Sequence, residues 1–244
     1  MVRRTSLQED SVTTIAIGNL KGGIGATTLA VNLAALLQHA GHDVALVDCG
    51  SGAVVRWVQR RNRAGLGTIE CKSSSHEGTA DEGGSSYTVI DVGAHRKSLL
   101  PLLGYVDLWL APTPPVFPDY AATLNVFDLW RDAREEHGRP GLFAAAITQV
   151  GSGERDLEWM ARRKLFFARQ EMLVLNQSLA RHAAWDATYG GHAMHELPSH
   201  VAGKAASEFS TLVLQFLAFG LNALTEPGRL PTNHNGRPNA AVPL

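Results

Sequence analysis

Residues 12–28 read VTTIAIGNLKGGIGATT, an apolar run followed by a glycine-rich turn and a pair of threonines. The β-branched run before Gly18 predicts a buried strand. From Thr27 to Gln38 the apolar residues recur at helical spacing, and Gly41 marks the end of that helix. A strand, a glycine-rich loop and a helix in this order turn backbone N–H groups inward at a helix N-terminus, so the segment predicts a phosphate-binding loop.

The rest of the chain repeats the alternation of strand and helix. Short apolar runs predict further strands at 44–47, 87–90, 106–111, 142–148 and 172–175, with helices at 54–63, 119–136, 154–170 and 199–223. This pattern predicts an α/β fold, a doubly wound, mainly parallel sheet with helices on both faces. Asp48 and Asp91 each follow a predicted strand. We therefore expect both at the edge where the glycine-rich loop lies, because ligands bind beyond the carboxyl ends of parallel strands.

Length and composition agree with one soluble globular domain. The chain has 244 residues, 45% of them hydrophobic, and a formal net charge of −1, so a surface built wholly for nucleic acid is not expected. Two cysteines, Cys49 and Cys71, are too few for a disulfide framework, and we expect a cytoplasmic protein. The expected organisation is an N-terminal extension at 1–11, one domain at 12–225 containing a mobile loop at 72–86, and a disordered proline-rich tail at 226–244.

The motifs resemble those of the ParA/MinD family of P-loop proteins. Residues 21–28, KGGIGATT, resemble its deviant Walker A motif, Lys-Gly-Gly-x-Gly-Lys-Thr-Thr/Ser. Val89-Ile90-Asp91 looks like the Walker B strand, and Leu46-Val47-Asp48 like the strand before switch I. The resemblance extends from about residue 12 to about residue 224, and small plasmid-type ParA proteins are the most similar in size and layout. The resemblance implies that the doubly wound sheet predicted from the strand and helix pattern is of the P-loop NTPase type.

This resemblance implies a nucleotide site for ATP or ADP with Mg²⁺. The residues that match the family's phosphate loop are Lys21, Gly22, Gly23, Ile24, Gly25, Ala26, Thr27 and Thr28. Thr27 and Asp91 would organise the metal, with Asp48 supporting its coordination shell. In the family the first lysine of the motif, here Lys21, reaches the phosphates of a partner subunit, which implies a homodimer.

Two positions depart from the family pattern. Ala26 stands where the family has its Walker lysine, and Gly50 where switch I has the carboxylate that positions the attacking water. A charge-assisted hydrogen bond contributes roughly 1.5–3 kcal/mol, so the loss of the lysine alone implies about 10- to 150-fold weaker binding. Because phosphoryl transfer depends on positioning and charge neutralisation, we expect hydrolysis to be very weak or lost. No catalytic residue is assigned, and Asp48 is the one remaining candidate.

ParA proteins also bind DNA non-specifically through basic surface residues. The candidates on the helix at 154–170 are Arg155, Arg162, Arg163, Lys164 and Arg169, and arginines at 56–63 form a second basic cluster. A solvated amphipathic face is the alternative explanation of both clusters, and the sequence favours it over DNA contact. The chain lacks the basic amphipathic C-terminal helix of MinD-like members, and its apolar run at 212–221 is too short to span a bilayer, so no membrane contact is expected.

The sequence therefore favours a ParA-like protein that partitions or positions DNA, such as a plasmid or conjugative element. It would act as a dimeric scaffold, binding nucleotide or independent of it, with a partition-type DNA-binding partner protein. Two alternatives remain open: a slow ATPase stimulated by its partner, and a nucleotide-free adaptor or regulator that keeps the fold for its interaction surfaces.

Overall fold

A computed structural model describes residues 12–73, 85–116 and 119–226 of the chain. The predicted extension at 1–11 and nearly all of the predicted tail at 226–244 lie outside the described residues, as does most of the predicted loop at 72–86. The elements, in chain order, are β1 (Thr13–Gly18), α1 (Ala26–His39), β2 (Val44–Asp48), α2 (Ala53–Arg63), β3 (Glu70–Ser73), β4 (Tyr87–Gly93), α3 (Arg96–Leu99), η1 (Leu100–Leu102), β5 (Leu108–Thr113), α4 (Asp119–His137), β6 (Leu142–Ile147), α5 (Glu154–Ala168), β7 (Leu173–Val174), α6 (Ala184–Ala187), η2 (Thr188–Gly190), η3 (Met194–Glu196) and α7 (Ser199–Thr225).

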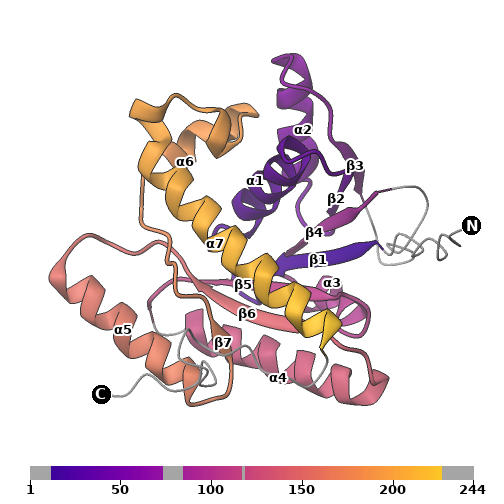
Figure 1. The fold of residues 1–244 in the computed structure, drawn as a ribbon, viewed down its shortest axis with the longest axis vertical. Helices are drawn as coiled ribbons and strands as arrows, with labels where there is room; N and C mark the ends of the chain where they lie inside the picture. The colour runs from indigo at the N-terminus through magenta and orange to yellow at the C-terminus, as the bar shows by residue number, and fades with distance from the viewer. Residues whose placement is uncertain (1–11, 74–84, 117–118, 227–244) are drawn as a thin grey trace, which may run out of the picture.

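The strands form one sheet in the order β3-β2-β4-β1-β5-β6-β7. Every pair of neighbouring strands is parallel, and β1 lies between β4 and β5 at the centre (Figure 1). The predicted doubly wound α/β fold is thus confirmed. Because β1, β2 and β4 are adjacent and parallel, their carboxyl ends bring the glycine-rich loop, Asp48 and Asp91 to one edge of the sheet.

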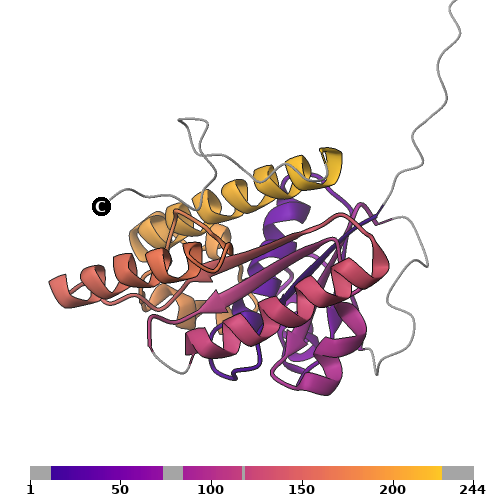
Figure 2. The same cartoon turned by 90° about the horizontal axis from the view of Figure 1, so that it is seen from below.

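Each face of the sheet carries its own hydrophobic core. On one face α1, α2 and α7 pack on Ile15, Leu46 and Leu110. On the other face α3, α4 and α5 pack on Ile90 and on Trp109. Figure 2 shows α7 and α4 on opposite sides of the strands. The alternate residues of the central strands are buried on both faces, which explains why these strands read as continuous apolar runs in the sequence.

The edge strand β3 was not predicted from the sequence. Its residues, Glu70–Ser73, are mostly exposed and polar, and they pair with β2 alone among the described strands. A short edge strand with one exposed side needs no apolar run, so its sequence resembles a loop. The predicted loop at 72–86 therefore begins two residues too early.

The helix α7 matches the helix predicted at 199–223 and extends two residues beyond it. Among the described residues it is the one helix long and apolar enough, by length and composition, to cross a membrane. The inner side of α7 contributes Phe209, Leu212 and Phe216 to the core of the sheet, while Leu214 and Leu221 are exposed. The packing of the inner side is that of a core helix lying across the sheet.

Candidate nucleotide-binding site

The loop between β1 and α1 wraps around a cavity at the carboxyl edge of the sheet. Gly23 and Gly25 have φ angles of +77° and +92°, which side chains with a Cβ rarely adopt. This backbone leads directly into the N-terminus of α1 at Ala26. The cavity has a volume of about 770 Å³, and all eight residues predicted to bind nucleotide, 21–28, line it. Its size and its helix N-terminus suit a phosphorylated ligand.

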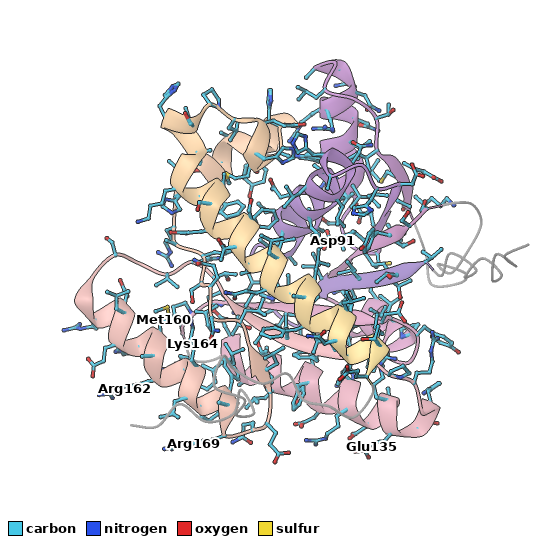
Figure 3. The ribbon with its side chains drawn as sticks, in the orientation of Figure 1. Asp91, Glu135, Met160, Arg162, Lys164 and Arg169 are labelled. Carbon is cyan, nitrogen blue, oxygen red and sulfur yellow. The ribbon has the colours of Figure 1, made fainter. Side chains whose placement is uncertain are left out.

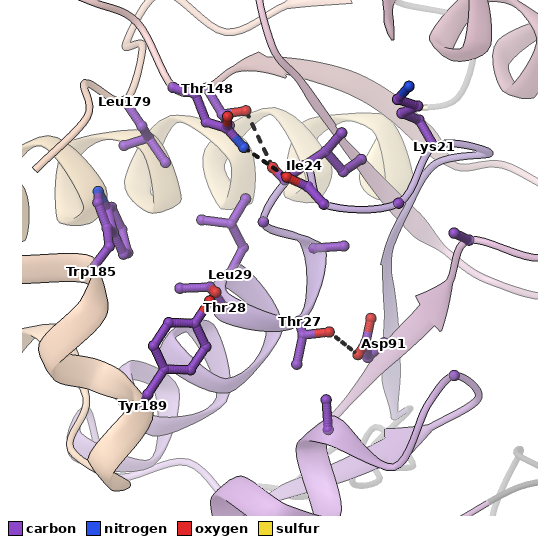
Figure 4. Close-up of a pocket in the computed structure, with 18 of the residues that line it drawn as sticks. Lys21, Ile24, Thr27, Thr28, Leu29, Asp91, Thr148, Leu179, Trp185 and Tyr189 are labelled. Carbon is purple, nitrogen blue, oxygen red and sulfur yellow. Dashed lines mark hydrogen bonds between the residues drawn. The ribbon is translucent and has the colours of Figure 1, made fainter.

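Thr27 and Asp91 meet at the floor of the cavity. The Thr27 hydroxyl, in the first turn of α1, donates to Oδ2 of Asp91 at 2.6 Å (Figure 4). Asp91, at the end of β4, is almost fully buried. Burial raises its pKa to about 6, although the Thr27 hydrogen bond opposes the shift. A hydroxyl and a carboxylate are oxygen donors of the kind that Mg²⁺ prefers, so the residues present fit the metal that the family implies.

Asp48 has a different set of contacts. One carboxylate oxygen accepts the backbone N–H of Gly50 at 2.9 Å, and the other accepts that of Val54 at 2.9 Å; Gly52 and Val55 lie at 3.3 Å. These N–H groups belong to the first turn of α2 and the loop before it, so Asp48 satisfies donors that the helix leaves unpaired. Its predicted role in the metal shell stays a prediction, and holding the start of α2 is the role that its contacts support.

The two departures from the motif have distinct structural settings. Ala26 lines the cavity and also packs against the core. At Gly50, an added Cβ would lie 3.2 Å from the Cα of Gly93, and one at Gly93 would lie 2.9 Å from the Cα of Gly50. Gly93 also has a φ of +71°. The loops after β2 and β4 thus approach each other at a pair of glycines, which leaves little room for a side chain.

Lys21 is the first residue of the predicted loop. Its ammonium lies 3.7 Å from a carboxylate oxygen of Asp119, the first residue of α4. Half of the Lys21 side chain is exposed, whereas that of Asp119 is nearly buried. The lysine is therefore held at the mouth of the cavity by its own chain. A weak ion pair of this exposure contributes at most about 1 kcal/mol and leaves the ammonium free to move to another anion.

The wall of the cavity also includes residues from later in the chain that the sequence motifs do not reveal. The Gln149 side chain donates to the carbonyl of Gly23 at 3.0 Å, and Arg181 donates to the carbonyl of Gln149 at 3.1 Å. Trp185 and Tyr189 form part of the wall (Figure 4). These residues lie more than 120 positions after the loop, and only the closing of the sheet brings them beside it.

The basic residues proposed for DNA contact differ in how accessible they are. Arg155, Arg162 and Arg169 are exposed on or just after α5, and Figure 3 places Arg162 and Arg169 far from Asp91. Arg162 pairs with Glu158 at 2.6 Å. By contrast, the Arg163 guanidinium lies over the ring of Tyr120 at 4.4 Å, and Lys164 donates to the carbonyl of Asn176, with its pKa lowered by desolvation. The last two are engaged in contacts within the domain.

The family of the chain follows from comparison with known proteins. Residues 15–205 match the CobQ/CobB/MinD/ParA nucleotide-binding domain, which is more than half of the chain. The structure agrees with this match, because it has a parallel sheet, a phosphate-binding type of loop and a buried carboxylate at Asp91. The chain belongs to the CobQ/CobB/MinD/ParA family of nucleotide-binding proteins.

The chain is also similar to individual proteins of known name. The chain is 35% identical over 116 residues to a "Maintenance of carboxysome distribution protein A" from Gloeobacter kilaueensis, an alignment that covers 46% of this chain and spans about half, 53%, of that relative. The fold of this chain is similar to that of McdA from Cyanothece in complex with ATP. The TM-score is 0.64 at 13% identity, and the match covers 85% of this chain and 96% of McdA. A putative plasmid partition protein from Borrelia burgdorferi bound to AMPPNP gives 0.63 at 13% identity, covering 85% and 99%.

The structural likenesses, at these low identities, concern the fold alone. What the comparisons establish for this chain is its family and its fold. Which nucleotide, cargo and partner the chain takes is decided by its own residues.

Proposed function

We propose that this chain is a ParA-like positioning protein that holds ATP or ADP with Mg²⁺ and hydrolyses it very slowly or not at all. The observation that supports the proposal is the hydrogen bond of 2.6 Å between Thr27 and Asp91 at the floor of the 770 Å³ cavity. This pair is kept, although the Walker lysine and the switch I carboxylate are replaced by Ala26 and Gly50. Bound Mg²⁺ would neutralise phosphate charge; Thr27 and Asp91 would hold it.

Slow hydrolysis follows from what the site lacks. The attacking water of a phosphoryl transfer has to be oriented, and charge on the phosphoryl oxygens has to be neutralised. Asp48, the carboxylate of β2 at this edge, has both oxygens accepting backbone N–H groups of the α2 N-terminus. It is therefore poorly placed to orient water. Nucleotide would then act by holding a conformation or a dimer, with Lys21 reaching the partner's phosphates.

The first test restores the missing cation. In calorimetric titrations of Mg²⁺-ATP, Ala26→Lys should bind about 10- to 150-fold more tightly than the wild type, because a charge-assisted hydrogen bond contributes roughly 1.5–3 kcal/mol. Ala26 lines the cavity, so the new side chain has space to reach a phosphate. Ala26→Met, of similar length but uncharged, is the matched control and should gain no affinity.

Three outcomes of this titration separate the candidate functions. Wild-type binding with little phosphate release supports a nucleotide-held scaffold. Binding with steady turnover contradicts the slow-hydrolysis proposal and supports the partner-stimulated ATPase. No binding at millimolar nucleotide by the wild type or Ala26→Lys contradicts nucleotide use and leaves the adaptor or regulator.

For cargo, we propose DNA of a plasmid or conjugative element, in the cytoplasm, through a homodimer and a partition-type DNA-binding partner protein. Non-specific DNA contact would use Arg155, Arg162 and Arg169, the exposed members of the α5 cluster. A second candidate cargo is a protein compartment, favoured by the 35% identity to a carboxysome distribution protein. An electrophoretic mobility shift assay with non-specific duplex DNA distinguishes the two cargoes. Binding by the wild type that is lost in a triple alanine variant of these arginines supports DNA. No binding by the wild type supports the compartment.

A further inference from the structure

A second, smaller hollow adjoins the nucleotide cavity between α1 and α2. Its volume is about 220 Å³. It shares Thr27, Thr28 and Tyr189 with the main cavity, and two arginines of α2, Arg56 and Arg60, complete its wall. The shared threonines belong to the first turn of α1, where a bound nucleotide's phosphates would lie. The small hollow therefore places two cations beside the phosphate end of the site.

The two arginines have different partners. Arg60 donates to the backbone carbonyl of Tyr189 at 2.8 Å, which joins α2 to the turn after α6. Arg56 donates from Nη1 to the carbonyl of Ser51 at 3.0 Å. Ser51 lines the main cavity, on the loop that follows Asp48. A guanidinium has five N–H donors in a fixed plane, so this one contact orients the Arg56 side chain at the phosphate end and leaves donors for an anion.

The other cationic side chains that line the main cavity have contacts elsewhere. Lys21 lies at the mouth, beside Asp119. Arg181 donates to the carbonyl of Gln149. Position 26, from which a lysine would reach the phosphates, is alanine. Arg56 and Arg60 both have exposed side chains and line the small hollow with Thr27 and Thr28. Arg56 is the one nearer the start of α2, and it contacts Ser51 of the main cavity.

We propose that Arg56 binds a phosphate of the nucleotide and supplies from α2 the positive charge that Ala26 no longer supplies from α1. This inference rests on the proposed nucleotide binding. It explains why a chain without the Walker lysine keeps the rest of its phosphate loop. An arginine also suits the task because its planar fork matches phosphate oxygens two at a time.

The test compares ligands with and without phosphates. Arg56→Gln should weaken binding of Mg²⁺-ATP and Mg²⁺-ADP in calorimetric titration by about 10- to 150-fold, the range of one charge-assisted contact, and leave binding of adenosine unchanged. Arg63→Gln is the matched control, since Arg63 is exposed on the same helix and lines neither hollow. In the Arg56→Gln background, Ala26→Lys should recover ATP affinity.

The outcomes distinguish this inference from the function on which it rests. If the wild type binds ATP and Arg56→Gln binds it equally well, the inference is wrong and the proposed function stands. If the wild type binds no nucleotide, both are wrong. If Arg56→Gln weakens DNA binding but not ATP binding, the arginine belongs to a DNA surface. Should Arg56→Gln fail to fold, Arg56→Met, which keeps a long side chain but removes the charge, should weaken ATP binding relative to the wild type; equal affinity would overturn the inference.

Discussion

Replacing Arg61 by alanine should lower the free energy of unfolding by about 3–5 kcal/mol, because it removes a buried guanidinium and leaves the partly buried carboxylate of Glu196 without that cation. Arg61 is 4% exposed. Its guanidinium donates to both carboxylate oxygens of Glu196, at 2.7 and 2.8 Å, and to the carbonyl of Gly191 at 3.3 Å. The pair joins α2 to the segment before α7. For a domain of this size the midpoint of thermal unfolding should fall by about 6–20 °C.

Urea unfolding followed by tryptophan fluorescence measures this loss. Arg63→Ala, an exposed position on the same helix, should change the free energy of unfolding by no more than about 0.5 kcal/mol. The double variant Arg61→Met with Glu196→Leu removes both charges and should regain most of the stability, since apolar side chains can replace a buried ion pair. A loss below about 1 kcal/mol in Arg61→Ala would show that the pair is not structural.

Asp91→Asn should stabilise the nucleotide-free protein at pH 8 and abolish its Mg²⁺-dependent nucleotide binding. Burial raises the pKa of Asp91 from 3.8 to about 6. Between these values the folded state binds more protons than the unfolded state, so stability falls as the pH rises through this window. At about 1.4 kcal/mol per pKa unit, the charged carboxylate costs about 2–3 kcal/mol above pH 6. Asparagine is uncharged and still accepts the Thr27 hydroxyl.

Thermal melts of the wild type and Asp91→Asn between pH 4 and pH 8 check the sign. The stability difference should be small near pH 4, grow towards pH 6 and then stay constant. Asp128→Asn replaces an exposed carboxylate and should show no such window. In the same melts, Mg²⁺-ATP should raise the midpoint of the wild type but not of Asp91→Asn. A variant less stable than the wild type at pH 8 would mean that the ionised carboxylate stabilises the fold.

Local patterns were enough to predict the sheet and the phosphate end of the site. The β-branched runs that become β1, β2 and β4 are buried on both faces, so burial itself produces the pattern that predicts them. The common position of the glycine-rich loop and Asp91 was predictable too, because the carboxyl ends of parallel strands lie at one edge of the sheet. The predicted helices at 119–136 and 154–170 match α4 and α5 to within two residues at each end.

Contacts between distant segments could not be predicted. Arg61 and Glu196 are 135 positions apart, and Gln149 reaches Gly23 across 126. Periodicity describes neighbours in the chain and carries no information on such pairs. The same limit explains the basic clusters. In sequence Arg61 and Arg163 resemble surface charges, yet one is buried against Glu196 and the other stacks on Tyr120.

The glycine pair at 50 and 93 also constrains how this chain could evolve. An aspartate introduced at position 50 would place its Cβ 3.2 Å from the Cα of Gly93, so the backbone at Gly93 would have to shift slightly as the carboxylate entered. A sequence that matched the family pattern at positions 26 and 50 would thus also require accommodation by a second loop. Positions 50 and 93 are therefore expected to change together and not one at a time.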